Sequence, residues 1–162
     1  AIGQNVENVG KLVGIDVTSD FSVILVSIDA KGREDVLCKE KMCPVIGIKK
    51  YKTFEEAVKI AEANLEYEGK GHTVAIHSNN MNNLKYAGEK LPVSRLLVNQ
   101  ICATMNGGSF VNGLAATTTL GCGSWGNNSI SENLDYKHFI NITRIATVIE
   151  GAVQPSDDEI WG

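Results

Sequence analysis

The first half of the chain alternates between apolar residues at helical spacing and short apolar runs. Within residues 2–13 the apolar positions recur at helical spacing and predict a helix. The runs at 21–28 and 45–48 are short and rich in β-branched residues, which is typical of buried strands. This part of the chain therefore predicts a helix followed by two strands.

The clearest helix signal follows these two strands. Thr53 and Glu56 have the spacing of a capping box, in which each side chain satisfies a backbone N–H group of the other residue. An apolar stripe then runs at helical spacing as far as Leu65, and Gly69 supplies a typical C-terminal stop. The sequence thus predicts a helix that begins just after Thr53 and ends near Gly69.

Strands and helices continue to alternate beyond Gly69. Residues 72–77 and 95–99 are predicted strands, and residues 80–91 between them are a predicted amphipathic helix that Pro92 halts. This alternation is typical of an α/β fold with a mostly parallel sheet and helices on its faces. The chain shows no internal repeat and no linker, so one domain is expected.

One predicted strand has no evident partner within the chain. Phe139–Val148 alternates well enough for a strand, with Ile140 and Ile142 on one face. A strand without a partner exposes its backbone hydrogen-bonding groups. We therefore expect this segment to pair outside the domain.

The composition of the chain limits the kinds of molecule that it is expected to bind. The chain has 162 residues, of which 43% are hydrophobic and 21% charged, with a net charge of −4. This charge argues against a nucleic-acid or membrane-surface partner. The longest apolar run is far too short to span a bilayer and the N-terminal residues lack the features of a signal peptide, so a cytoplasmic location is expected. The four cysteines form no Cys/His cluster, which predicts free thiols and no metal site.

The segment from Leu96 to Ser131 differs from the rest of the chain. Its 36 residues include no Asp, Glu, Lys or Arg and contain six of the sixteen glycines. A backbone that passes close to a ligand needs such residues, since glycine allows close approach and unusual dihedral angles. A long buried loop at an interface would have the same composition, and composition does not choose between the two.

A glycine pattern within this segment invites a nucleotide-binding interpretation. Gly121–Gly126 fits G-x-G-x-x-G, but the residues that follow do not open an apolar-periodic helix, so we interpret the match as coincidence. Cys122 in this pattern could be an exposed nucleophile or a small buried thiol. Because no histidine lies within fifteen residues of it, the buried thiol is favoured.

Two further residues are candidates for chemistry. His72 stands at the start of a predicted strand, and ligand sites of parallel sheets gather at strand ends. A single histidine is more often structural, so the signal is weak. Glu40 precedes another predicted strand, where a solvated surface charge is the default interpretation.

Several motifs taken together resemble the CoA-acylating branch of the aldehyde dehydrogenase superfamily, the family of acetaldehyde-, succinate-semialdehyde- and sulfoacetaldehyde-type enzymes. The resemblance covers nearly the whole chain, and Thr-Leu-Gly-Cys-Gly-Ser-Trp-Gly is its most specific motif. The segments that carry it are Glu40–Pro44, Lys52–Val58, Gly71–Thr73, Ser94–Asn99, Thr119–Ser129 with Glu132 and Asn133, and the tail from Lys137 to Ile142 with Glu159–Trp161.

The resemblance implies roles for individual residues. Glu40 matches the glutamate that binds the nicotinamide ribose, and Met42 stands where the superfamily often has an aromatic residue beside the nicotinamide. His72 matches an active-site histidine of the acylating enzymes. The residues implied near the aldehyde pocket are Thr117, Thr118 and Thr119.

The resemblance also implies an architecture and a reaction. Residues 1–134 would be the C-terminal portion of a three-layer α/β/α catalytic domain of the aldehyde dehydrogenase type, and residues 135–162 an arm that forms a homodimer or homotetramer. The nucleophilic cysteine and the nucleotide-binding domain are expected upstream of Ala1. The enzyme would convert a small aldehyde, CoA and NAD or NADP to acyl-CoA through a cysteine thioester. The alternative is a non-catalytic binding or oligomerisation domain that retains the fold.

Overall fold

The computed structural model describes every residue from Ala1 to Gly162. Four short 3-10 turns, η1 (Gly32–Glu34), η2 (Val36–Cys38), η3 (Ser124–Gly126) and η4 (Tyr136–His138), supplement the helices and strands. Those helices and strands are, in chain order, α1 (Val6–Val13), β1 (Ile24–Ser27), β2 (Val45–Ile48), α2 (Phe54–Tyr67), β3 (Gly71–Ile76), α3 (Met81–Lys90), β4 (Val93–Val98), α4 (Cys102–Met105) and α5 (Asp157–Trp161). The predicted order of helices and strands through residue 98 is confirmed.

Helix α2 begins where the sequence predicts, with one difference in its cap. The Thr53 hydroxyl accepts a hydrogen bond from the Glu56 N–H at 3.2 Å. The Glu56 carboxylate accepts from the Lys52 N–H at 2.8 Å rather than from that of Thr53. The N-cap is therefore confirmed, whereas the reciprocal half of the predicted capping box is shifted by one residue.

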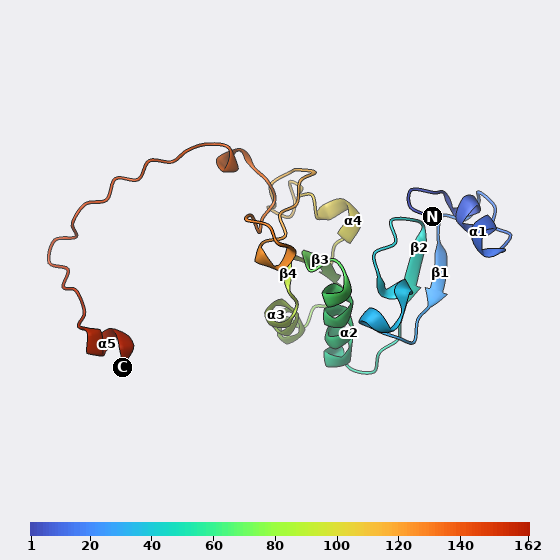
Figure 1. Ribbon diagram of the computed structural model, residues 1–162, viewed down its shortest axis with the longest axis horizontal. Helices are drawn as coiled ribbons and strands as arrows, with labels where there is room; N and C mark the ends of the chain where they lie inside the picture. The colour runs from blue at the N-terminus through green and yellow to red at the C-terminus, as the bar shows by residue number, and fades with distance from the viewer.

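The strands are parallel but form two sheets. Strand β1 pairs with β2 and strand β3 pairs with β4, and no strand joins the two pairs. Figure 1 shows the two sheets as separate units, with α2 between them. The α/β class with parallel strands is confirmed, and within this chain the strands form two separate pairs. Each sheet consequently has two open edges.

Helices cover only one face of the β3–β4 sheet. Helices α2 and α3 pack on it around Val58, Ile76, Ala87 and Leu91, which form the buried core cluster. The opposite face meets the uncharged residues 99–131, here called the Gly-rich segment, which contain one short α-helix, α4, and the 3-10 turn η3. Within this chain that face is therefore covered by turns rather than by helices, since glycine and asparagine between residues 106 and 133 favour turns over helix.

Apolar surface remains uncovered on the other sheet. Along both β1 and β2, exposed residues alternate with half-buried ones. Leu25, Ile46 and Ile48 lie on the exposed face, with 59%, 53% and 43% of their surfaces accessible. Only 14 of the 162 residues are buried, so much of the apolar surface of this chain has no cover within the chain.

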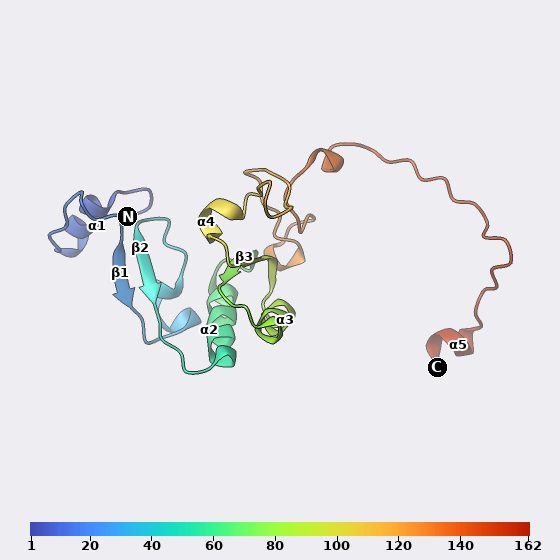
Figure 2. The ribbon, with the colours of Figure 1, turned by 180° about the vertical axis from the view of Figure 1, so that it is seen from behind.

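The C-terminal residues leave the folded body. Figures 1 and 2 show an extended tail that runs away from the sheets and ends in α5. No strand forms within residues 140–155, so their backbone pairs with no other strand. The side chains of Ile145 and Val148 are 90% and 95% exposed. The predicted strand Phe139–Val148 is therefore not formed within the chain, because a strand requires a second strand to pair with. Its pairing with another subunit stays a prediction.

The helices also bear on membrane insertion. The longest helix, α2, has 14 residues, and no helix combines the length and apolar character needed to cross a bilayer.

Candidate functional site

The turn that joins α2 to β3, residues 68–72, is here called the α2–β3 turn. It contacts the loop that carries Glu40, the Gly-rich segment and the side chain of Arg95 on β4. The loop that carries Glu40 is attached to it through Glu68. The Glu68 carboxylate accepts a hydrogen bond from the Glu40 N–H at 3.1 Å and lies 3.7 Å from the Lys39 Nζ. This attachment brings Glu40 to the segment that leads directly into His72.

The Gly-rich segment packs on the same turn. Gly71 has a φ of +85°, and a Cβ atom there would overlap the carbonyl oxygen of Cys122. Gly126 likewise packs against Cys122 and the carbonyl oxygen of Lys70. Only glycine at position 71 lets the two backbones approach this closely in this conformation.

A buried arginine links these parts, and the sequence-based interpretation missed it. Arg95 on β4 is only 4% exposed. Its guanidinium donates hydrogen bonds to the Gly121 carbonyl at 2.8 Å, the His72 carbonyl at 3.2 Å and the Thr73 hydroxyl at 3.0 Å. One side chain thus connects both strands to the Gly-rich segment. A single cation within an apolar strand was the available sequence signal.

The side chains of His72 and Glu40 are exposed beside this turn. The His72 Nδ1 lies 3.0 Å from the Thr73 hydroxyl oxygen. The Glu40 carboxylate makes no hydrogen bond or ion pair within the chain. Met42, two residues further along the loop, is 65% exposed, has a φ of +48° and accepts a hydrogen bond through its carbonyl from the Gly3 N–H. Glu40 and His72 are therefore brought to one turn, with Met42 on the same loop as Glu40.

The predicted pocket threonines lie on the Gly-rich segment. Thr117 is half-buried, whereas Thr118 and Thr119 are exposed. The Thr117 hydroxyl accepts from the Thr119 N–H at 3.0 Å, which tightens the chain just before Gly121. Gly121 in turn supplies the carbonyl that Arg95 binds. The threonines are thus connected to the α2–β3 turn through the backbone, and their side chains form no hydrogen bond with it.

Amide side chains, rather than regular secondary structure, hold the Gly-rich segment together. Asn133 is 4% exposed, and its amide nitrogen donates to the carbonyls of Asn106 at 3.1 Å and Ala115 at 2.9 Å. Phe110 and Val111 are fully or largely exposed on the same segment. The segment therefore combines a built interior with uncovered apolar side chains, and its two interpretations, ligand site and interface, both stay predictions.

The glycine pattern lacks the helix that follows a dinucleotide-binding turn. Residues Ser124–Gly126 form a single 3-10 turn, and Asn127 after it adopts a left-handed conformation with φ +58°. No helix begins there, so no helix N-terminus is available for a pyrophosphate. The expectation that no helix opens after Gly126 is confirmed, and the interpretation of the match as coincidence stays a prediction.

The four cysteines share one type of surroundings. All four are free and half-buried. Burial raises the pKa of the Cys102 thiol, and the nearby positive charge of Arg95 offsets this only in part. No group of three or more His, Cys, Asp or Glu side chains is placed to hold a metal ion.

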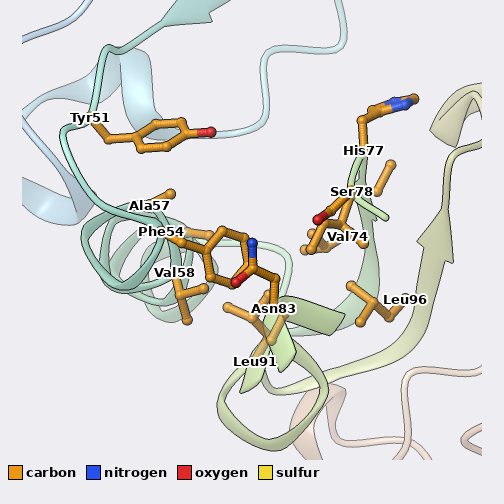
Figure 3. Close-up of a pocket in the computed structure, with 14 residues that line it drawn as sticks. Tyr51, Phe54, Ala57, Val58, Val74, His77, Ser78, Asn83, Leu91 and Leu96 are labelled. Atoms are coloured by element: carbon orange, nitrogen blue, oxygen red, sulfur yellow. The ribbon is translucent and has the colours of Figure 1, made fainter. Parts of the chain in front are cut away.

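A separate apolar pocket of about 390 Å³ lies between α2, α3 and the β3–β4 sheet. Figure 3 shows Tyr51 and His77 on opposite sides of it, with Phe54 and Leu91 between the helices and the sheet. None of the predicted site residues lines it. His77 follows the carboxyl end of β3, where ligands of parallel sheets normally bind, whereas His72 stands at the amino end. The strand-end argument for His72 therefore fails, and its candidacy depends on the α2–β3 turn and on the family resemblance.

Known proteins match this chain over its whole length. No family model matches it. It is 57% identical over 161 residues to succinate-semialdehyde dehydrogenase (acetylating) of Clostridium kluyveri, and 39% identical to sulfoacetaldehyde dehydrogenase of Acholeplasma sp. These alignments cover 99% of this chain but 35% and 33% of the relatives, so the chain spans about a third of their length.

Solved structures agree with the sequence relatives. An acetylating aldehyde dehydrogenase of Geobacillus thermoglucosidasius superposes with a TM-score of 0.83 at 30% identity, covering 95% of this chain and 34% of that one. A probable aldehyde dehydrogenase of Listeria monocytogenes EGD-e gives the same TM-score at 33% identity, covering 98% of this chain and 34% of that one. The fold is thus that of part of an aldehyde dehydrogenase. Over almost all of its residues the chain is similar to acetylating and acylating aldehyde dehydrogenases, and it matches a C-terminal part of them.

Proposed function

We propose that this chain is the C-terminal part of the catalytic domain of a CoA-acylating aldehyde dehydrogenase. The enzyme would convert a small aldehyde, CoA and NAD or NADP⁺ to acyl-CoA and NAD(P)H. The observation that carries this proposal is the α2–β3 turn, which holds the Glu40 loop and the Gly-rich segment beside His72. The 57% identity to an acetylating dehydrogenase supports it.

The residues of the Glu40 loop fit a dinucleotide. The Glu40 carboxylate is exposed and has no partner within the chain, so both oxygens are free to accept hydrogen bonds from ribose hydroxyls. The exposed Met42 side chain offers apolar contact to a nicotinamide ring. When bound, NAD or NADP supplies the hydride acceptor for aldehyde oxidation.

The remaining roles follow from the same arrangement. His72 would contact the reacting aldehyde or its thioester, and Thr117–Thr119 would form part of the substrate wall. The nucleophilic cysteine would come from outside these 162 residues, which agrees with the half-buried state of all four thiols and the raised pKa of Cys102. CoA would be the second substrate.

The C-terminal tail would be an oligomerisation arm. We propose the division into residues 1–134, part of the catalytic domain, and residues 135–162, the arm. The extended backbone after η4 and the exposed apolar side chains of Phe139, Ile145 and Val148 support this division. Addition of the segment to a sheet of a second subunit would cover both its backbone groups and these side chains.

A chimera tests the proposed function directly. This chain would replace the matching third of the Clostridium kluyveri dehydrogenase, and NADH or NADPH formation from succinate semialdehyde and CoA would be measured. Glu40→Gln should lower kcat/KM for the dinucleotide about tenfold, because one weakened hydrogen bond to a charged group is worth about 1.5 kcal/mol. Glu40→Ala should lose more.

Controls separate this role from a general effect of surface charge. Glu89→Gln removes another exposed carboxylate that has no hydrogen bond within the chain, and it should leave the kinetics unchanged. The isolated chain should show no dehydrogenase activity. Parental kcat and cofactor KM in the Glu40→Ala chimera would refute the ribose-binding role, and a chimera that folds without any activity would favour a non-catalytic domain.

A further inference from the structure

The burial of Arg95 requires an explanation beyond packing. Its guanidinium is almost fully removed from water, yet it forms no ion pair with any carboxylate. All three of its hydrogen bonds go to neutral oxygens. Burial of an unpaired cation costs stability that an apolar side chain at the same position would not cost. A residue retained at such a cost is a candidate for a specific task.

The contact between Arg95 and Thr73 indicates what this task is. These residues are direct partners in the register of β3 and β4, so their side chains lie side by side. The Arg95 Nε–H donates to the Thr73 Oγ1 at 3.0 Å, and arginine can only donate. One acceptor position of the hydroxyl is thereby occupied, and its single proton remains to be donated.

The only other partner of this hydroxyl is His72. The His72 Nδ1 lies 3.0 Å from the Thr73 Oγ1, and apart from Arg95 no other group of the chain forms a hydrogen bond with that oxygen. If Nδ1 carried the imidazole proton, the hydroxyl would accept twice and its own proton would have no acceptor within the chain. With Nδ1 unprotonated, every donor in the hydrogen-bonded series Arg95–Thr73–His72, here called the relay, has an acceptor.

We propose that Arg95 and Thr73 are positioning residues that hold neutral His72 in the tautomer with its proton on Nε2. The exposed face of the ring then presents an N–H donor rather than a base. In the proposed dehydrogenase, on which the catalytic part of this inference rests, His72 donates a hydrogen bond to an oxygen that gains negative charge, and it removes no proton. The tautomer itself is a property of this chain and can be measured without any activity.

Nitrogen NMR of the chain labelled with ¹⁵N-histidine measures the tautomer. The chain has three histidines, so replacement of His77 and His138 by glutamine assigns the signals of His72. At about pH 9, where free histidine is neutral, His72 should show a protonated Nε2 and a hydrogen-bonded, unprotonated Nδ1. A protonated Nδ1 would overturn the proposal.

Variants test each link of the relay. Thr73→Val keeps the β-branched shape but removes the hydroxyl, so the Nδ1 signal should move to the position of an unbonded nitrogen. Thr73→Ser should restore it. Arg95→Met leaves the hydroxyl free to accept, so a population with protonated Nδ1 should appear, whereas Arg95→Lys should give a smaller change. An Nδ1 signal that is the same in parent and Thr73→Val would overturn the relay.

Kinetics of the chimera separate the relay from a general structural role. Thr73→Val should lower kcat about tenfold, the effect of losing one hydrogen bond that orients a catalytic group. In a His72→Gln background the same replacement should cost nothing further, because the relay acts through His72 alone. An equal loss in both backgrounds would overturn the relay. Full activity of His72→Gln together with the expected NMR result would instead refute the catalytic role of His72 and leave the relay standing.

Discussion

Replacement of Asn133 by alanine probes what holds the Gly-rich segment in place. The Asn133 amide donates to two carbonyls, those of Asn106 and Ala115, at 3.1 and 2.9 Å. Its side chain is almost fully buried, and its Oδ1 has no partner, so the two N–H bonds are all that the side chain contributes in hydrogen bonding. Alanine removes both donors and leaves two carbonyls to find new ones.

The expected loss in the free energy of unfolding can be worked out from these two hydrogen bonds. A buried hydrogen bond contributes roughly 1 kcal/mol net, and a buried group left without a partner costs roughly 1–3 kcal/mol. Two such losses give about 2–4 kcal/mol for Asn133→Ala, with the lower end expected where water enters the space of the lost side chain. Asn133→Asp keeps the shape but faces both carbonyls with a carboxylate, so it should destabilise the chain further.

Urea denaturation of the chain measures this loss. The midpoint for Asn133→Ala should fall while the slope of the free energy of unfolding against urea stays unchanged. Asn82→Ala is the matched control, because Asn82 is exposed on α3 and its side chain has no hydrogen-bond partner. A midpoint equal to that of the parent for Asn133→Ala would refute the conclusion that this amide organises the segment.

Two smaller predictions concern the helix cap and one thiol. Thr53→Ala should lower the free energy of unfolding by about 1 kcal/mol through loss of the α2 N-cap, and an unchanged urea midpoint would contradict that cap. Because burial raises the pKa of Cys102 in the folded chain, its contribution to stability is complete below the ordinary thiol pKa of 9.0 and is lost as the pH rises above it. Iodoacetamide should accordingly alkylate Cys102 more slowly in the folded chain than in urea at the same alkaline pH, and equal rates would argue against its burial.

The helices and strands could be predicted because their signals are local. The cap at Thr53, the apolar stripe of α2 and the β-branched runs of the strands act within a few residues of one another. Which strands share a sheet is not a local property. The alternation of strands and helices is the same whether β2 neighbours β3 or not, so the division into two sheets could not be inferred from it. The proposed pairing of the 139–148 segment would require a second chain, so local patterns could not show it either.

The candidate site was predictable only in part, for a related reason. Glu40 and His72 were identified by resemblance, and their common attachment to the α2–β3 turn depends on Glu68, a residue without any distinctive pattern of its own. The role of Arg95 could not be predicted from its neighbours, because the apolar residues around it indicate only a strand. Its importance comes from a carbonyl at Gly121, 26 residues away, which no spacing rule connects to it.

The most specific sequence motif now has a physical explanation that differs from nucleotide binding. Gly121 donates its N–H to the Glu132 carbonyl at 3.0 Å and offers its own carbonyl to Arg95 at 2.8 Å. A Cβ atom at position 121 would overlap the carbonyls of Ile130 and Glu132. A larger residue would therefore push the backbone at position 121 away from these carbonyls. Arg95 would then lose an acceptor, and with it the geometry that places its Nε–H on Thr73. Gly121 therefore matters because the lack of a side chain lets its backbone lie close to Ile130 and Glu132 with its carbonyl on the buried Arg95, and the proposed His72 tautomer would depend on that placement.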